Sequence, residues 1–92
     1  MRFTWDETKR QSNLRKHGHD FADAHRVFQG LMVLAEDGRN DYGEQRMIAH
    51  GLLDAVVVVV IHVEADQTIR IISMRKGDKY EANRNYEEIG DA

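Results

Sequence analysis

The fold of this chain is most constrained by an unbroken apolar run, five valines and an isoleucine at residues 56–61. β-Branched residues favour strands, and a continuous apolar run of this length is typical of a strand that is covered on both faces. A strand with one face in water shows alternating apolar and polar residues instead. We therefore expect residues 56–63 to form a strand that is buried on both sides of a β-sheet.

A second strand-like segment carries fixed cations where a sheet prefers apolar or neutral residues: Arg70-Ile71-Ile72-Ser73-Met74-Arg75-Lys76. Because a buried guanidinium without a partner is costly, Arg70 and Arg75 must be paired or must face a site that uses their charge. The planar fork of arginine matches a phosphate, which favours an anion site at the end of a small sheet.

The spacing of these two arginines decides whether they can share a site. Residues five apart in a regular strand point to opposite faces. Arg70 and Arg75 therefore converge only if a bulge intervenes or if Arg75 lies past the end of the strand. The alternative is an ordinary ion pair with a carboxylate such as Glu44 or Glu81.

The composition is that of a globular protein, with 92 residues, 41% hydrophobic and 32% charged. We expect one domain over residues 1–92. The absence of cysteine excludes disulfides and thiolate metal sites. No apolar run approaches the roughly 18 residues of a membrane span, and the charged start of the chain does not resemble a signal peptide. These features predict a cytoplasmic protein without membrane contact.

The charge pattern bears on nucleic-acid binding in two ways. A formal net charge of −3 argues mildly against a dedicated nucleic-acid binder, whose surface is usually basic. Two segments, residues 1–30 and 67–79, nevertheless carry more Lys and Arg than Asp and Glu. If the fold brings them together, they form a local positive patch on an acidic molecule.

The first third of the chain predicts a short strand and two helices. Residues 2–5 are strand-like, and Asp6 is a suitable N-cap for a helix that ends before Gly18. Asp20 is a suitable cap for a second helix, which Gly30 ends. Two helices joined by a short turn predict an αα-hairpin.

The remainder predicts a meander and a last helix. Strands are expected at residues 31–36, 44–52, 56–63 and 68–75, separated by short polar turns. Asp78 is expected to cap a helix that reaches about residue 88. The resulting α+β fold has an N-terminal αα-hairpin and a C-terminal helix packed on an antiparallel four-stranded meander, with residues 2–5 as a candidate extra strand.

Other candidate site residues each have a structural alternative. Glu44 and Arg46 lie on one strand face, where an exposed cross-strand ion-pair ladder is the simpler interpretation. Lys16 and His17 suit the negative end of a helix dipole, whereas a functional His17 would transfer protons, because histidine titrates near neutrality. Trp5 could stack on a base or pack in the core. The five histidines lack the helical spacing of a zinc site, so we expect neither a metal nor another cofactor.

Two sets of residues carry a resemblance to a known family. Those in the first half are Trp5, Asp6, Lys9, Asn13, Lys16, His17, Gly18 and Phe21; those in the second half are residues 43–46, Gly51, the valine strand, residues 70–76, Glu81, Tyr86 and Glu87. In this order the chain resembles the BrnT family, the toxins of bacterial type II toxin–antitoxin pairs. The resemblance implies a RelE-like fold, ribonuclease activity that blocks translation, and neutralisation by a ribbon-helix-helix antitoxin similar to BrnA. Contact with DNA would occur only through that antitoxin.

The resemblance also implies roles for individual residues. RelE-like ribonucleases resemble metal-free nucleases in which the RNA 2′-hydroxyl attacks the adjacent phosphorus. On this basis Arg46, Arg70 and Arg75 would bind phosphate and stabilise transition-state charge, and Lys16 or His17 would transfer a proton. Glu44 would be an alternative base or an orienting partner for Arg46. The expected RNA contacts are Trp5, Lys9, Ser73, Lys76 and Lys79. The rival hypothesis is a non-catalytic module that binds a protein or a nucleic acid.

Overall fold

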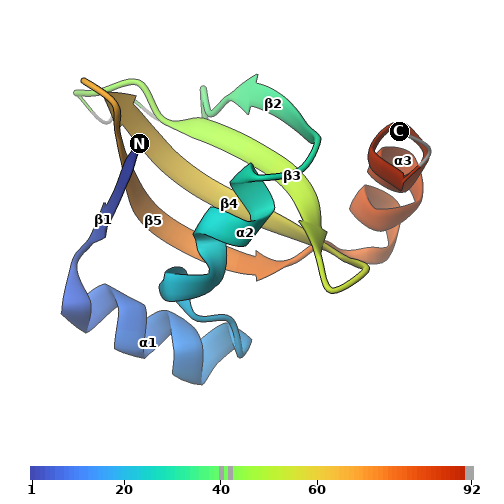
Figure 1. Ribbon diagram of the computed structural model, residues 1–92, viewed down its shortest axis with the longest axis horizontal. Coiled ribbons are helices and arrows are strands. Elements are labelled where there is room, and N and C mark those ends of the chain that lie inside the picture. The colour runs from blue at the N-terminus through green and yellow to red at the C-terminus, as the bar shows by residue number, and fades with distance from the viewer. Residues whose placement is uncertain (40, 42, 91–92) are drawn as a thin grey trace.

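The computed structural model describes residues 1–39, 41 and 43–90, with side chains up to residue 84. The elements are β1 (Arg2–Trp5), α1 (Glu7–His17), a 3₁₀ turn (Phe21–Asp23), α2 (Ala24–Phe28), β2 (Met32–Glu36), β3 (Met47–Leu53), β4 (Val56–Ala65), β5 (Thr68–Lys76) and α3 (Lys79–Gly90). Five strands form one sheet in the order β1-β5-β4-β3-β2 (Figure 1). The predicted α+β class is confirmed.

The valine run forms the middle strand, β4, and is covered on both faces as expected. Val58 and Val60 belong to the main core, together with Phe21, Ala24 and Val27 from the 3₁₀ turn and α2. On the opposite face, the buried β4 side chains are Val57, Val59 and Ile61. α2 therefore covers one face of the sheet, and α3 contacts strands β2, β3 and β4.

The prediction of a four-stranded antiparallel sheet is wrong in one respect. Strands β2 to β5 pair antiparallel, but β1 adds a fifth strand that runs parallel to β5, so the sheet is mixed. β1 fits this edge because Phe3 and Trp5 pack against the core cluster. The candidate extra strand is therefore an integral part of the sheet.

The predicted αα-hairpin is only partly present. The first helix has the expected caps, because the Asp6 carboxylate accepts from the Lys9 N–H and Gly18 takes a left-handed conformation with φ of 74°. The second segment is shorter than expected. The Asp20 side chain accepts from the Ala22 N–H, which starts a 3₁₀ turn, and only Ala24–Phe28 is α-helical.

α1 continues the edge of the sheet where β1 ends. Asn13, which is 7% exposed, donates from its side-chain amide to the Met74 carbonyl (2.7 Å) and accepts from the Met74 N–H (3.1 Å). The Asn13 side chain thus makes the two backbone hydrogen bonds that a neighbouring strand would make with Met74, and it fixes α1 beside β5. Within the described residues, no helix is both long and apolar enough to cross a bilayer.

Candidate active site

A β-bulge in β5 sets the direction of the charged side chains. Ile61 of β4 is paired with Ser73 and His62 with Ile71, which leaves Ile72 as an extra residue between them. Because of this extra residue, side chains on either side of Ile72 that are an odd number of positions apart, such as those of Ile71 and Met74, point to the same face of the sheet. Ile69, Ile71 and Met74 consequently all belong to the core.

The same bulge places Arg70, Ser73 and Arg75 on the other face of β5, which we call the charged face. Their partners on β4 are Val63, Ile61 and Val59, three residues that share one face of that strand. The bulge that the sequence required for Arg70 and Arg75 to serve one site is present. Both arginines are also ion-paired, so the alternative stated above holds as well.

At one end of this face, two guanidinium groups approach one carboxylate. Arg70 donates from Nη2 to both oxygens of Glu44, each at 2.6 Å, and Arg46 Nε lies 3.8 Å from Glu44 Oε1. Hydrogen bonding by Arg70 is the main cause that lowers the pKa of Glu44. Glu44 therefore occupies an anion position between cations from β5 and from the residue that precedes β3.

At the other end, Arg75 is held by the first turn of α3. Its Nη1 and Nη2 donate to the two oxygens of Glu81 at 2.7 and 3.0 Å. The Asp78 N–H also donates to Glu81 (2.9 Å), and the Asp78 carboxylate caps the Glu81 N–H (2.8 Å). Chiefly through the bond from Arg75, the pKa of Glu81 falls from 4.5 to about 2. His50 Nε2 lies 3.5 Å from Glu81 Oε2.

The contact between His50 and Glu81 was not predicted from the sequence. The two residues are 31 positions apart and meet only when α3 packs on the sheet. The readable signal was the Asp78-x-x-Glu81 spacing, which resembles a capping box and fixes Glu81 in the first helical turn. A cavity of about 480 Å³ adjoins the pair and is lined by residues of β2, β3 and α3.

Two further hollows lie along the seam between α1 and β5. One, of about 380 Å³, is lined by Thr4, Trp5, Asp6, Lys9, Arg70 and Ile72 among others. The second, of about 230 Å³, is lined by residues that include Lys9, Ser12, Lys16, His17, Ile72 and Ser73. They share Lys9 and Ile72 and therefore adjoin each other. Together they form a groove lined by six of the predicted site residues, namely Trp5, Lys9, Lys16, His17, Arg70 and Ser73.

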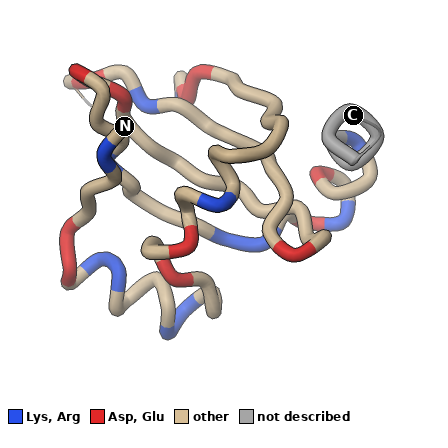
Figure 2. The backbone as a smooth tube through the Cα atoms, viewed as in Figure 1, with Lys and Arg blue, Asp and Glu red and all other residues tan. Residues whose placement is uncertain are grey.

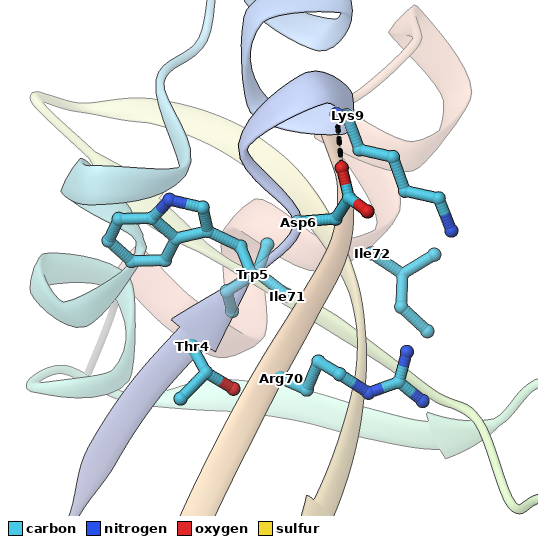
Figure 3. Close-up of a pocket in the computed structure, with 7 residues that line it drawn as sticks. All are labelled: Thr4, Trp5, Asp6, Lys9, Arg70, Ile71 and Ile72. Carbon is cyan, nitrogen blue, oxygen red and sulfur yellow. Dashed lines mark hydrogen bonds between the residues drawn. The ribbon is translucent and has the colours of Figure 1, made fainter.

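Trp5 lines this groove but its ring lies apart from the cations. In Figure 3 the side chains of Lys9 and Arg70 extend to one side of the strands, and the indole of Trp5 lies on the other. The ring packs against the core cluster, in agreement with the structural alternative given for Trp5. The indole of Trp5 is therefore directed toward the core and away from the cations of the groove (Figure 3).

Lys76 and Lys79 lie at the other end of β5. Lys76 is its last residue, Lys79 is the first of α3, and both are exposed. Figure 2 shows basic residues along α1 and near the end of β5, whereas acidic residues occupy many of the turns. The two basic segments identified in the sequence therefore lie beside each other. Within the described parts of the chain, no three His, Asp or Glu side chains gather as metal ligands would.

Comparison with known families gives the geometry its context. A family model described as the ribonuclease toxin BrnT of a type II toxin–antitoxin system matches residues 5–81. The chain belongs to the BrnT family. The match extends from Trp5 to Glu81, so it contains both ends of the charged face and the groove. Membership implies a protein antitoxin as partner. No curated protein matches the chain.

Proposed function

We propose that this BrnT-family chain cleaves RNA without a metal ion, with the groove between α1 and β5 and the adjoining charged face as its active surface. The observation that carries the proposal is the bulge at Ile72, because it directs Arg70, Ser73 and Arg75 to one face. Fixed cations on a preorganised sheet are the groups that stabilise charge on a phosphoryl oxygen without a metal.

In the proposed reaction the RNA 2′-oxygen attacks the adjacent phosphorus while a base takes its proton. The bond from phosphorus to the 5′-oxygen breaks, and that oxygen receives a proton from an acid. The products are a 2′,3′-cyclic phosphate and a 5′-hydroxyl. Lys16 or His17, exposed at the end of α1 beside Ser73, is the candidate for one of the two proton transfers.

Arg46, Arg70 and Arg75 bind the phosphate backbone and the charge that grows on it. The Glu44 carboxylate, which already accepts two bonds from Arg70, marks the position that a phosphate oxygen would take. Glu44 orients Arg70 and Arg46 in the free protein and is the alternative base. Lys9, Ser73, Lys76 and Lys79 extend the RNA contact along both ends of β5.

Family membership supports a proposal for the biological setting. We propose that residues 1–92 form one RelE-like toxin domain that acts in the cytoplasm and inhibits translation. A ribbon-helix-helix antitoxin similar to BrnA neutralises it and provides the only contact with DNA. Type II toxins are paired with protein antitoxins, which supports the general part of this assignment.

One observation favours a second candidate function, a binding module without turnover. Both motif arginines are paired with carboxylates, Arg70 with Glu44 and Arg75 with Glu81. Arginines that are fully engaged within the chain would support the sheet or grip an antitoxin, and would not require a substrate.

Cleavage of a labelled RNA by the purified chain separates the two candidates. With excess chelator present, the proposed enzyme yields fragments that end in a cyclic phosphate, and expression of the chain alone arrests growth. A chain that binds RNA or antitoxin but yields no fragments would support the binding module. Cleavage that stops completely on chelation would contradict metal independence.

A further inference from the structure

His50 lines a cavity that the roles above leave unused. The cavity is formed by β2, β3 and the start of α3, and it is lined by His50, Glu81, Tyr80 and Arg84 among others. The His50 side chain is 16% exposed, so a ligand in this cavity can reach it while the strand holds its backbone. A histidine beside a carboxylate in a cavity is a common arrangement for proton transfer.

The sheet register connects His50 to the arginine motif. His50 and Arg75 are both paired with Val59, from opposite sides of β4. The three residues therefore share one face of the sheet, with the outer two roughly 10 Å apart at their Cα atoms. Glu81 bridges that interval. Its Oε1 accepts from Arg75 Nη1 at 2.7 Å, and its Oε2 accepts from Arg75 Nη2 at 3.0 Å and lies 3.5 Å from His50 Nε2.

The protonation state of Glu81 determines which histidine nitrogen is available. With a pKa of about 2, the carboxyl is ionised at neutral pH and can only accept hydrogen bonds. Nε2 of His50 must then carry the proton that points to Glu81. In the neutral ring this leaves the lone pair on Nδ1, and a fixed tautomer is what a general base requires.

We propose that His50 is the general base of the RNA cleavage reaction and that Glu81 is its positioning residue. Nδ1 takes the proton of the 2′-hydroxyl as the new bond to phosphorus forms. The departing 5′-oxygen takes its proton from water rather than from Lys16 or His17, because the cavity at His50 and the hollow at Lys16 and His17 share no lining residue. Arg75 contributes positive charge next to Glu81. This inference rests on the proposed function and adds a residue outside the 70–76 motif. Among the described residues, the other charged or titratable groups that line this cavity are Asp78, which precedes α3, and Tyr80 and Arg84 on α3.

The test compares His50→Ala with His25→Ala, because His25 is an exposed histidine on α2 that contacts Phe3. In single-turnover cleavage of a labelled RNA, we expect His50→Ala to lower the rate about 10²–10⁴-fold. RNA affinity stays within about threefold of the wild-type value, since a base acts on the chemical step. Added imidazole restores part of the rate of His50→Ala and none of the rate of Arg75→Ala. A His50→Ala rate equal to that of the control would overturn the proposal.

Two additional measurements keep the test decisive. If His50→Ala does not fold, His50→Gln preserves volume and a polar group, and it must show the same loss of rate. Glu81→Gln should change the shape of the pH–rate profile, whereas a merely structural residue would lower the rate equally at every pH.

A readout that does not depend on cleavage separates this inference from the proposed function. ¹⁵N NMR of the His50 ring should show the proton on Nε2 in the wild-type protein and a tautomer mixture in Glu81→Leu. If the wild-type protein cleaves no RNA, the proposed function fails, although the NMR result still reports on Glu81 as the positioning residue. If the wild-type protein cleaves RNA but the tautomer is the same in both proteins, only the role of Glu81 fails.

Discussion

Each end of the charged face carries an arginine paired with a glutamate, but the two glutamates are held in very different ways. Glu44 precedes β3 outside any helix or strand, and its side chain is 34% exposed. Glu81 lies in the first turn of α3, is 20% exposed, and also accepts from the Asp78 N–H. Arg70 and Arg75, in contrast, are similarly exposed at 42% and 39%. The arginines are therefore alike, and the difference lies in their partners.

This difference predicts which ion pair a substrate can replace. An exposed pair contributes little to stability because water screens it, so an RNA phosphate can displace Glu44 from Arg70 at low cost. A carboxylate that accepts from Arg75 and from a backbone N–H cannot leave without stranding both donors. We infer that the Arg70 end exchanges its anion during function. Arg75 keeps Glu81 and acts on the phosphate as a fixed positive charge held by that carboxylate.

Among the predictions that compare the two ion pairs, the largest expected effect is the loss of cleavage in Arg70→Ala and Arg75→Ala. Each removes a cation at the position of developing charge, so we expect a rate about 10²–10³-fold lower in single-turnover assays. Arg26→Ala is the matched control, because Arg26 on α2 is also an exposed arginine paired with a carboxylate, Asp54. Cleavage by both motif variants at the rate of the control would remove the enzymatic proposal.

The second prediction contrasts Glu81→Gln with Glu44→Gln in urea unfolding. Loss of the anchored carboxylate should lower the free energy of unfolding by about 2 kcal/mol. Loss of the exposed one should cost clearly less, because water screens it. Similar costs for the two variants would contradict the distinction between a fixed and an exchangeable partner.

The same Glu44→Gln variant assigns the role of Glu44. If the carboxylate competes with phosphate, its removal should tighten RNA binding about threefold to tenfold. A large loss of cleavage with unchanged RNA affinity would instead identify Glu44 as the base.

Local features of this fold could be predicted from the sequence, and features that depend on distant contacts could not. The caps Asp6 and Gly18 act within one turn of the helix, so their effect was readable. The bulge at Ile72 arises from the register between β4 and β5, and no residue within β5 specifies it alone. The second helix was overestimated because Asp20 was expected to cap an α-helix, whereas its carboxylate accepts from Ala22 and starts a 3₁₀ turn.

The candidate site shows the same division. The motif placed Arg70, Ser73 and Arg75 on one strand, and the end of the first helix had drawn attention to Lys16 and His17. The family resemblance added Lys9, which lines the groove together with Lys16 and His17. His50 was recognised only as a strand residue, because the carboxylate that gives it a role lies on another element. A single sequence reports spacing along a strand or helix, but the contact between β3 and α3 requires the packed structure.

The third prediction concerns the stability that is lost in acid when Glu81, at the Arg75 end of the charged face, is protonated. The pKa of Glu81 is lowered to about 2, so its contribution to stability is complete above its unfolded pKa of 4.5 and is lost as the pH falls toward 2. Between pH 5 and pH 3 we expect the wild-type protein to lose about 1 kcal/mol more stability than Glu81→Gln. Urea unfolding at several pH values measures this difference. Parallel pH profiles for the two proteins would show that the Glu81 carboxylate is not coupled to folding.

The smallest expected effect distinguishes the two ends by RNA contact. Lys9 lines the groove beside Arg70, and Lys79 starts α3 near Arg75; both side chains are exposed. If a single strand of RNA follows β5 along its whole length, Lys9→Ala and Lys79→Ala each remove one phosphate contact. Each should then weaken binding by about 0.5 kcal/mol and reduce the salt dependence of log K by roughly 0.7. Fluorescence anisotropy over a range of salt concentrations measures both quantities. Equal effects place the RNA across both ends, whereas an effect of Lys9→Ala alone would confine the RNA to the groove and leave His50 beyond its reach.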